Sequence, residues 1–165
     1  MNNNTEMIFQ PIGSVMSPHQ DLEGMPIQPT GARGVKGKII LNPDLVEGLK
    51  DLEGFSHLLL IYFFHQSDGY DLLIKPFLDD DIHGVFATRA PRRPNKIGIS
   101  VVKLLGIQGN VLEIEDIDML DGTPVLDIKP FIPELDNLGV VRLGWLEDKL
   151  EEFEQTRSDD RFISE

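Results

Sequence analysis

The sequence predicts a mainly β protein, a small closed antiparallel or mixed β-barrel with one short internal helix and one C-terminal helix. About seven or eight short apolar segments follow one another, separated by turns rich in Gly, Pro, Asn and Asp. Strands and helices do not alternate along the chain, and neither Gly-x-Gly-x-x-Gly nor a Walker loop is present, which excludes a nucleotide-binding α/β sheet. Short connections between consecutive strands favour antiparallel pairing and closure.

The strands are expected, in chain order, at 8–15, 34–41, 55–66, 70–77, 85–88, 97–107, 111–117 and 125–132. The segment 55–66 is the clearest, because apolar side chains occupy both of its faces, and we expect it to be buried on both sides. It ends at the polar pair His65-Gln66. Gly109-Asn110 predicts a tight hairpin between two strands.

Two helices are predicted. Asn42 is a suitable N-cap for a short helix that begins at Pro43 and ends at Gly54. A second, amphipathic helix is expected over 143–153 from the spacing of Leu143, Leu146, Leu150 and Phe153. The chain is therefore divided into a disordered N-terminus at 1–6, a barrel domain at 7–135, and an acidic helix and tail at 136–165.

The 165 residues suit one domain, and the absence of cysteine excludes disulfides and thiolate chemistry. The net charge of −13 opposes general binding to nucleic acid. That charge is uneven, because residues 110–165 hold 5 Lys and Arg against 16 Asp and Glu, whereas residues 30–109 are nearly neutral. Without a signal-peptide pattern or an apolar run of about 20 residues, we expect a cytoplasmic protein with no membrane partner.

A stiff basic loop stands out in the middle of the chain. Between Arg89 and Lys96 lie 4 of the 15 Lys and Arg, and Pro91 and Pro94 restrict the backbone around them. Such a loop suits the binding of an anion, although a solvated basic turn is an equal alternative.

The turn Asp121-Gly122-Thr123-Pro124 offers a carboxylate, a hydroxyl and backbone amides close together. Asp121-Gly122 alone is a common hairpin turn, but the longer motif suits an adenosine or amino-acid-like ligand. The 4 histidines lack metal-binding spacing, so no metal site is predicted. The acidic run 79–81 is more simply a charged turn than a cation site.

Together these motifs resemble the TsaA/TrmO-like family of methyltransferases. The similar segments, in order over residues 7–135, are Ile12-Gly-Ser-Val with Ser17-Pro18, Leu52-Glu-Gly-Phe-Ser-His-Leu, Phe64-His-Gln66, Gly84-Val-Phe-Ala-Thr-Arg89, Arg93-Pro-Asn-Lys-Ile-Gly-Ile-Ser100 and Asp121-Gly-Thr-Pro-Val-Leu-Asp-Ile-Lys-Pro130. The resemblance implies a β-barrel that binds S-adenosylmethionine near a homodimer interface. It also implies methyl transfer to the exocyclic nitrogen of threonylcarbamoyl-adenosine beside the tRNA anticodon.

Carried onto this chain, the resemblance implies a cofactor site drawn from Pro26, Ile27, Gln28, His65, Gln66, Arg89, Leu112, Asp121, Gly122, Thr123 and Pro124. Arg89 would bind the methionine carboxylate, and His65 is the candidate for the catalytic base. The residues expected to face tRNA or the threonylcarbamoyl carboxylate are Arg92, Arg93, Asn95 and Lys96.

Three departures from the family pattern bear on these expectations. The net charge of −13 suits tRNA binding less than a basic protein would. The family commonly has a second proline where this chain has Lys96, which loosens the loop and adds a charge. Bacterial members carry a further C-terminal domain. At the corresponding place in this sequence, residues 136–165 form only the acidic segment. Three functions therefore stay open: a tRNA-adenosine methyltransferase, an S-adenosylmethionine-dependent methyltransferase of a small molecule or protein, and a non-catalytic S-adenosylmethionine-binding module.

Overall fold

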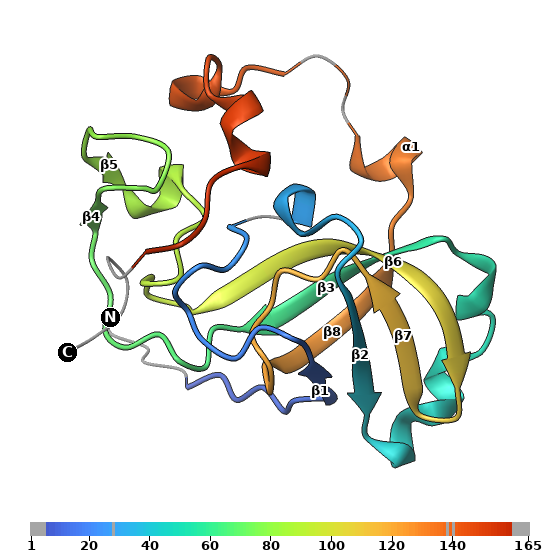
Figure 1. The fold of residues 1–165 in the computed structure, drawn as a ribbon. Helices are drawn as coiled ribbons and strands as arrows, with labels where there is room; N and C mark the ends of the chain where they lie inside the picture. The colour runs from blue at the N-terminus through green and yellow to red at the C-terminus, as the bar shows by residue number, and fades with distance from the viewer. Residues whose placement is uncertain (1–5, 28, 138, 140, 160–165) are drawn as a thin grey trace.

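The computed structural model describes residues 6–27, 29–137, 139 and 141–159, and its centre is a closed antiparallel β-barrel (Figure 1). The predicted fold class is thereby confirmed. Its strands close in the order β1-β2-β7-β6-β3-β8. Their bounds are Gly13–Met16 (β1), Lys36–Leu41 (β2), His57–Phe63 (β3), Ile97–Gln108 (β6), Val111–Glu115 (β7) and Pro124–Pro130 (β8). The short strands Leu73–Ile74 (β4) and His83–Gly84 (β5) pair separately.

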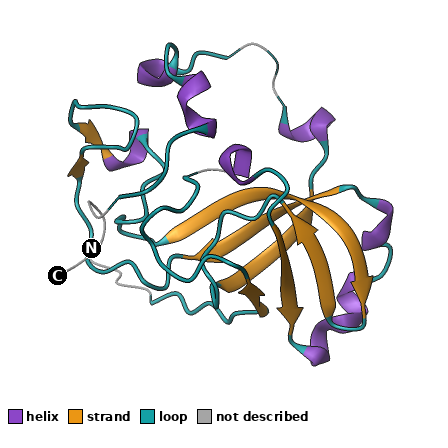
Figure 2. Cartoon of the chain, viewed as in Figure 1, coloured by secondary structure: helices purple, strands orange, loops and turns teal. Residues whose placement is uncertain are grey.

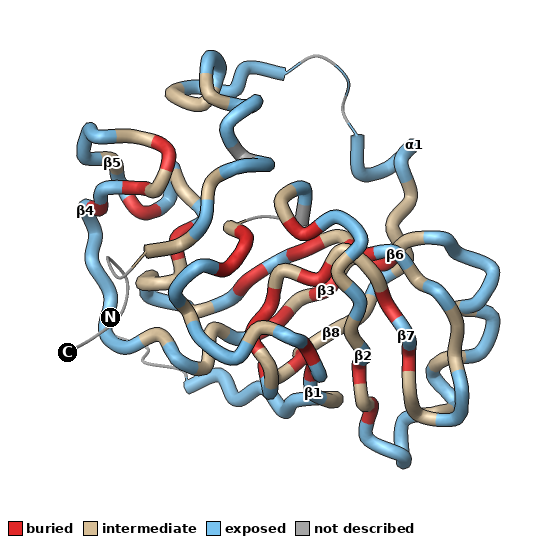
Figure 3. The backbone as a smooth tube through the Cα atoms, viewed as in Figure 1, coloured by how far each residue is buried: buried red, intermediate tan, exposed pale blue. Residues whose placement is uncertain are grey.

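Side chains from the strands pack into one core inside the barrel. Figure 3 shows the buried positions as red bands along the strands, and in β3, β6 and β7 they alternate with more exposed positions. In β3, Leu58, Leu60 and Tyr62 point inward and are buried. Leu59 and Ile61 lie on the other face and are only partly buried. The expectation that 55–66 is buried on both sides is therefore wrong for the outer face, because a barrel wall has one interior side.

The helices are short and lie outside the barrel wall (Figure 2). The 3₁₀ helices span Pro29–Ala32, Pro43–Leu49, Leu52–Gly54, Val85–Ala87, Gly144–Leu146 and Leu150–Glu154, and one α-helical turn, α1, spans Pro133–Asp136. The predicted cap at Asn42 is confirmed, because its side-chain oxygen accepts a hydrogen bond from the Asp44 backbone N–H at 3.2 Å.

Several expected elements differ in the structure. The helix expected from Pro43 to Gly54 is divided into two 3₁₀ helices, because Asp51 between them has a φ of +67° in the left-handed region. The strand expected at 70–77 is reduced to Leu73–Ile74. The segment 85–88 begins with a 3₁₀ turn, and β5 precedes it. The helix expected over 143–153 is divided into two 3₁₀ helices, and Gly144 has a φ of +62° in the left-handed region, which an α-helix does not allow. The hairpin at Gly109-Asn110 is confirmed, with Gln108 opposite Val111.

The strand directions bring three long connections to one end of the barrel. Residues 17–35, 64–96 and 116–123 each leave a strand and return to the wall at this end, which we call the loop end. The opposite end carries residues 42–56 and the hairpin at 109–110. We call residues 17–35 the early loop. The early loop, the basic loop and the Asp121 turn therefore lie at the same end of the barrel, although they are far apart in sequence.

Candidate functional site

The loop end of the barrel holds a cavity of about 1220 Å³. All three long connections contribute to its wall. The predicted site residues that line it are Pro26, Ile27, His65, Gln66, Arg89, Arg93 and Thr123. The cavity continues onto the outer face of β3 and β6, where Leu59 and Val101 lie opposite each other. The segments that carry the predicted site residues therefore contribute to the wall of one cavity.

Several predicted site residues do not line the cavity. Leu112 is fully buried near the start of β7, beside the hairpin at the opposite end of the barrel, so its predicted contact with the cofactor has no support in the structure. Asp121, Gly122 and Pro124 belong to the turn that carries Thr123, but their atoms are not part of the wall. Gln28 lies outside the described residues.

The side chain and the backbone of Asp121 hold its turn by hydrogen bonds to backbone groups of the loop after β1. Asp121 Oδ1 accepts from the Ser17 N–H at 2.9 Å, and the Asp121 N–H donates to the His19 carbonyl at 2.8 Å. Gly122 has a φ of +74°, which favours glycine. Asp121 therefore fixes the loop after β1, and Thr123, only 3% exposed, faces the cavity.

The basic loop is attached to the preceding segment by its own cations. Arg92 Nε donates to Asp71 Oδ2 at 2.9 Å, and Lys96 Nζ donates to the Ser67 carbonyl at 2.5 Å. Arg93 lines the cavity, and its Nη1 donates to the Thr88 carbonyl at 3.2 Å. Neither Arg92, Lys96 nor Asn95 lies in the cavity wall. The four predicted substrate-binding residues are thus in two environments, and only Arg93 faces the cavity.

His65 is also part of this wall, at the end of the buried strand. Its Nδ1 lies 3.5 Å from the Thr123 hydroxyl. Burial lowers the pKa of His65 below its ordinary value of 6.5, so the ring is neutral at neutral pH.

A chain of polar side chains that the sequence analysis missed lies in the cavity wall, with Tyr62 and Ser100 buried and Asp118 partly buried. The Ser100 hydroxyl donates to Asp118 Oδ1 at 2.8 Å, and Tyr62 Oη lies 3.2 Å from the same hydroxyl. All three residues line the cavity. Burial raises the pKa of Asp118 to about 7, although the Ser100 hydrogen bond and the positive charge of Arg89 act to lower it. A hydroxyl at an inward position of β6 was the available signal, because a buried polar group needs a partner.

Comparison with known proteins places this chain in a family. A family model described as the tRNA-methyltransferase O N-terminal domain matches residues 14–137. The chain belongs to the TrmO N-terminal domain family. The matched region contains all residues of the barrel strands except Gly13, and also the basic loop, the Asp121 turn and Asp118.

Three relatives show the range of TrmO-family proteins. A "Probable S-adenosyl-L-methionine-binding protein" of Pyrococcus abyssi is 50% identical, over 94% of this chain and 85% of that protein. The human "tRNA (adenine(37)-N6)-methyltransferase" is 36% identical, over 79% of this chain but only 31% of its own length. A crystal structure of TrmO from Pseudomonas aeruginosa is 40% identical with a TM-score of 0.72, and the match covers 86% of this chain and 63% of that one.

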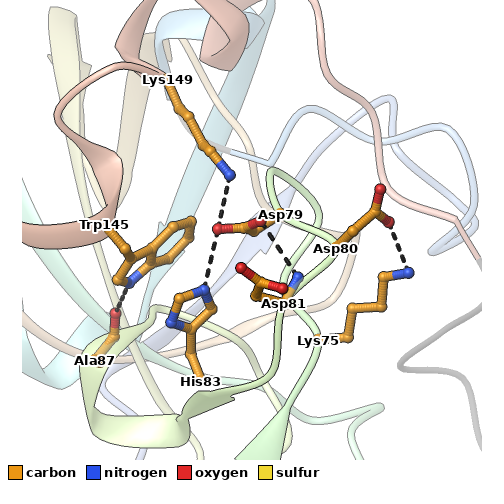
Figure 4. Close-up of polar contacts among 8 residues, drawn as sticks. All are labelled: Lys75, Asp79, Asp80, Asp81, His83, Ala87, Trp145 and Lys149. Carbon is orange, nitrogen blue, oxygen red and sulfur yellow. Dashed lines mark hydrogen bonds and ion pairs between the residues drawn. The ribbon is translucent and has the colours of Figure 1, made fainter.

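A segment beyond the TrmO-family region covers one side of the cavity. We call the described residues 141–159 the C-terminal strap. The Trp145 ring stacks on His83 at 4.4 Å between centroids, and its Nε1 donates to the Ala87 carbonyl at 2.8 Å (Figure 4). Lys149 Nζ lies 2.6 Å from Asp79 Oδ2, and the same oxygen lies 3.1 Å from His83 Nε2 (Figure 4). These contacts fix the strap to the β4–β5 segment.

The far end of the strap is joined to the early loop. The Met25 N–H donates to Ser158 Oγ at 2.9 Å, and the Ser158 N–H donates to the Met25 carbonyl at 2.9 Å. Arg33 Nη2 and Glu154 Oε1 form an ion pair at 2.7 Å. The strap thus contacts both the β4–β5 segment and the early loop, and it contributes Trp145 and Leu146 to the lining of the cavity. None of the helices in the described ranges is long and apolar enough to cross a membrane.

Proposed function

We propose that this chain is an S-adenosylmethionine-dependent methyltransferase, and that its acceptor is the exocyclic nitrogen of threonylcarbamoyl-adenosine beside the tRNA anticodon. The observation that carries the proposal is the cavity, because three separate loops of a TrmO-family barrel place Pro26, His65 and Thr123 in one wall with Arg89. Relatives named as S-adenosyl-L-methionine-binding proteins and as a tRNA (adenine(37)-N6)-methyltransferase support it.

The cavity fits the chemistry of the proposed cofactor. Its volume of about 1220 Å³ is larger than the roughly 300–1,000 Å³ of most small-molecule sites, so it has room for a ligand with an adenosine half and a methionine half together with part of an acceptor. Arg89 supplies a guanidinium for the carboxylate, and apolar Pro26 and Leu120 supply surface for a base or ribose. Thr123 and Gln66 add polar groups that can orient the ligand. These side chains thus suit an organic zwitterion as ligand. Among the described residues, no group of three or more His, Asp or Glu is placed to hold a metal ion.

The bound cofactor would supply an electrophilic methyl group on sulfur. The residues of the chain would then contribute orientation, because in-line displacement requires the acceptor nitrogen to approach from the side opposite the leaving sulfur. The strap and the loop end would exclude water from that approach through Trp145 and Leu146.

Recognition of the acceptor is proposed to rest on Arg93. Its position in the cavity wall suits the threonylcarbamoyl carboxylate. Arg92 and Lys96, which hold the loop to residues 67–71, would shape the approach of the tRNA backbone, with Asn95 beside them. A tRNA acceptor also supports the prediction of a cytoplasmic protein.

Homodimer formation is part of the proposal. Phe63, Ile97 and Ile99 are 38–44% exposed at the loop-end part of β3 and β6, next to the cavity. An apolar surface of this kind suits a second copy of the chain. Sedimentation of the unaltered protein should show a dimer. Sedimentation of a Phe63→Ser variant should show a monomer.

The experiment uses S-adenosylmethionine with a labelled methyl group and tRNA that carries threonylcarbamoyl-adenosine without the methyl. We expect label in that nucleoside after digestion of the tRNA. Arg93→Ala should weaken transfer, and Lys103→Ala, on the outer barrel surface beside Glu115, should not. Label in a small molecule or protein of an extract, but not in tRNA, would favour the second function. Cofactor binding without transfer to any acceptor would favour a binding module.

A further inference from the structure

Methyl transfer to this acceptor requires the nitrogen to lose a proton, and the cavity contains one group arranged to take it. We propose that Asp118 is the proton acceptor of the reaction, and this proposal rests on the proposed function above. The Asp118 carboxylate lines the cavity with Arg89 and Thr123, and one of its oxygens is held by Ser100.

The hydrogen bonds around Asp118 have a defined direction. An ionised carboxylate only accepts, so the Ser100 hydroxyl donates its hydrogen to Asp118 Oδ1. Ser100 must then accept from Tyr62, whose hydroxyl lies 3.2 Å away. Both partners stand on paired barrel strands, with Leu60 opposite Ser100 in the register. A rigid wall therefore positions Asp118 Oδ1, which is what a proton acceptor needs before the substrate arrives.

The charges around Asp118 suit reversible protonation. Burial raises its pKa to about 7, while the Ser100 hydrogen bond and the nearby Arg89 guanidinium favour the ionised form. Tyr62 stays neutral, because burial and the Asp118 charge raise its pKa. A base whose pKa lies near the working pH combines a useful ionised fraction with the strongest proton affinity. The position of Asp118 and the charges around it thus both favour its role as a proton acceptor.

The other titratable groups of the cavity are less suited to this task. Burial lowers the pKa of His65, which weakens it as a base. Asp116 Oδ1 accepts from the Gly34 N–H at 2.7 Å, and Asp136 Oδ2 accepts from the Ile132 N–H at 2.7 Å, so each fixes a loop. Asp159 lies at the end of the strap. Asp118 therefore replaces His65 as the proposed base.

The step balances without a further reactant. The acceptor nitrogen gives its proton to Asp118 Oδ and forms the new bond to the methyl carbon. The electron pair of the broken carbon–sulfur bond stays on the sulfur of the donor, whose positive charge is neutralised. Asp118 returns to the carboxylate when the proton passes to water after the product leaves.

Kinetics test the proposal through the conservative variant Asp118→Asn, with Asp127→Asn as the matched control. Asp127 lies on β8 with its partner Lys129 at 2.6 Å, outside the cavity wall. We expect kcat to fall about 10²–10⁴-fold in Asp118→Asn, with cofactor affinity changed less than about twofold. In the unaltered protein kcat should rise with pH and level off above about 7, and the variant should lack this rise.

A readout on the protein alone separates this proposal from the function on which it rests. The ¹³C signal of the Asp118 side-chain carboxyl should titrate near pH 7 without any ligand, and Tyr62→Phe should shift that midpoint. Titration near the ordinary value of 3.8 would overturn the proposal. An Asp118→Asn variant with unaltered kcat and an unaltered pH profile would also overturn the proposal, but it would leave the proposed methylation of tRNA intact. Absence of transfer by the unaltered protein would overturn both.

Discussion

Tyr62 lies face to face with Gly98 across the β3–β6 ladder, and its ring occupies the space that a side chain at position 98 would need. A Cβ built on Gly98 would lie 2.5 Å from Tyr62 Cζ and 2.9 Å from Phe64 Cζ. The Tyr62 and Phe64 rings pack edge to face at 5.4 Å, so neither can move aside alone. The absence of a side chain at Gly98 therefore positions the Tyr62 hydroxyl beside Ser100.

Gly98→Ala should lower the free energy of unfolding by about 1–3 kcal/mol, because the added methyl group overpacks this corner of the barrel. Gly106→Ala is the matched control in the same strand, since a Cβ there meets nothing within 4 Å. Urea denaturation measures both variants. Equal stability of the two would show that the Tyr62 ring has room to shift.

Asp118 should make the stability of the protein depend on pH near neutrality. Its pKa is about 7 in the folded protein and 3.8 ordinarily, so between these values the folded state holds a proton that the unfolded chain has released. The free energy of unfolding should therefore fall as the pH rises through this range, by at most about 1.4 kcal/mol per pH unit from this group.

The Asp118→Asn variant should lack this fall, and denaturation of both proteins between about pH 4 and pH 8 measures the difference. His65 acts with the opposite sign, because its pKa is lowered by burial and the folded state binds its proton less readily than the unfolded chain. Only the difference between the two proteins isolates Asp118. Parallel curves for the two proteins would contradict the raised pKa.

Arg89→Ala should weaken S-adenosylmethionine binding by about 1.5–3 kcal/mol, because it removes a charge-assisted bond to the carboxylate. Arg142→Ala, an exposed arginine at the start of the C-terminal strap, is the control. Calorimetric titration of the cofactor into each variant gives the affinity. An Arg89→Ala variant that binds as well as the unaltered protein would remove Arg89 from the site.

The barrel was predictable because its strands carry local signals, whereas the polar chain in the cavity wall was not. A continuous apolar run indicated β3, and Gly109-Asn110 predicted the β6–β7 hairpin. Asp118 stands between Ile117 and Met119 and gives no local sign that its carboxyl meets Ser100, which is 18 residues earlier. Such a contact depends on strand register and closure, which sequence periodicity does not report.

The C-terminal strap shows the same limit of sequence reasoning. The apolar spacing of Leu143, Leu146 and Leu150 predicted one α-helix, but these side chains line the cavity from a strap with two 3₁₀ helices. Tertiary contacts, above all the stacking of Trp145 on His83, determine its course. The spacing of the leucines therefore resembles that of an α-helix, although contacts with the cavity wall account for it.

The strap should hold the cavity closed through Trp145 and Lys149. Trp145→Ala removes the stacking on His83 and the hydrogen bond to Ala87, so amide exchange in residues 83–87 should become faster and cofactor affinity should fall. Lys103→Met removes an exposed ion pair with Glu115 on the barrel and should change neither. Unaltered exchange in Trp145→Ala would mean that the strap rests on the β4–β5 segment without stabilising it.

The central claim is that the loop-end cavity is the S-adenosylmethionine site, and a crystal structure of the protein grown with that compound tests it most directly. We predict electron density for the ligand between Arg89, His65 and Thr123, with the carboxylate on the guanidinium. Density for the compound at any other place on the molecule would contradict the claim.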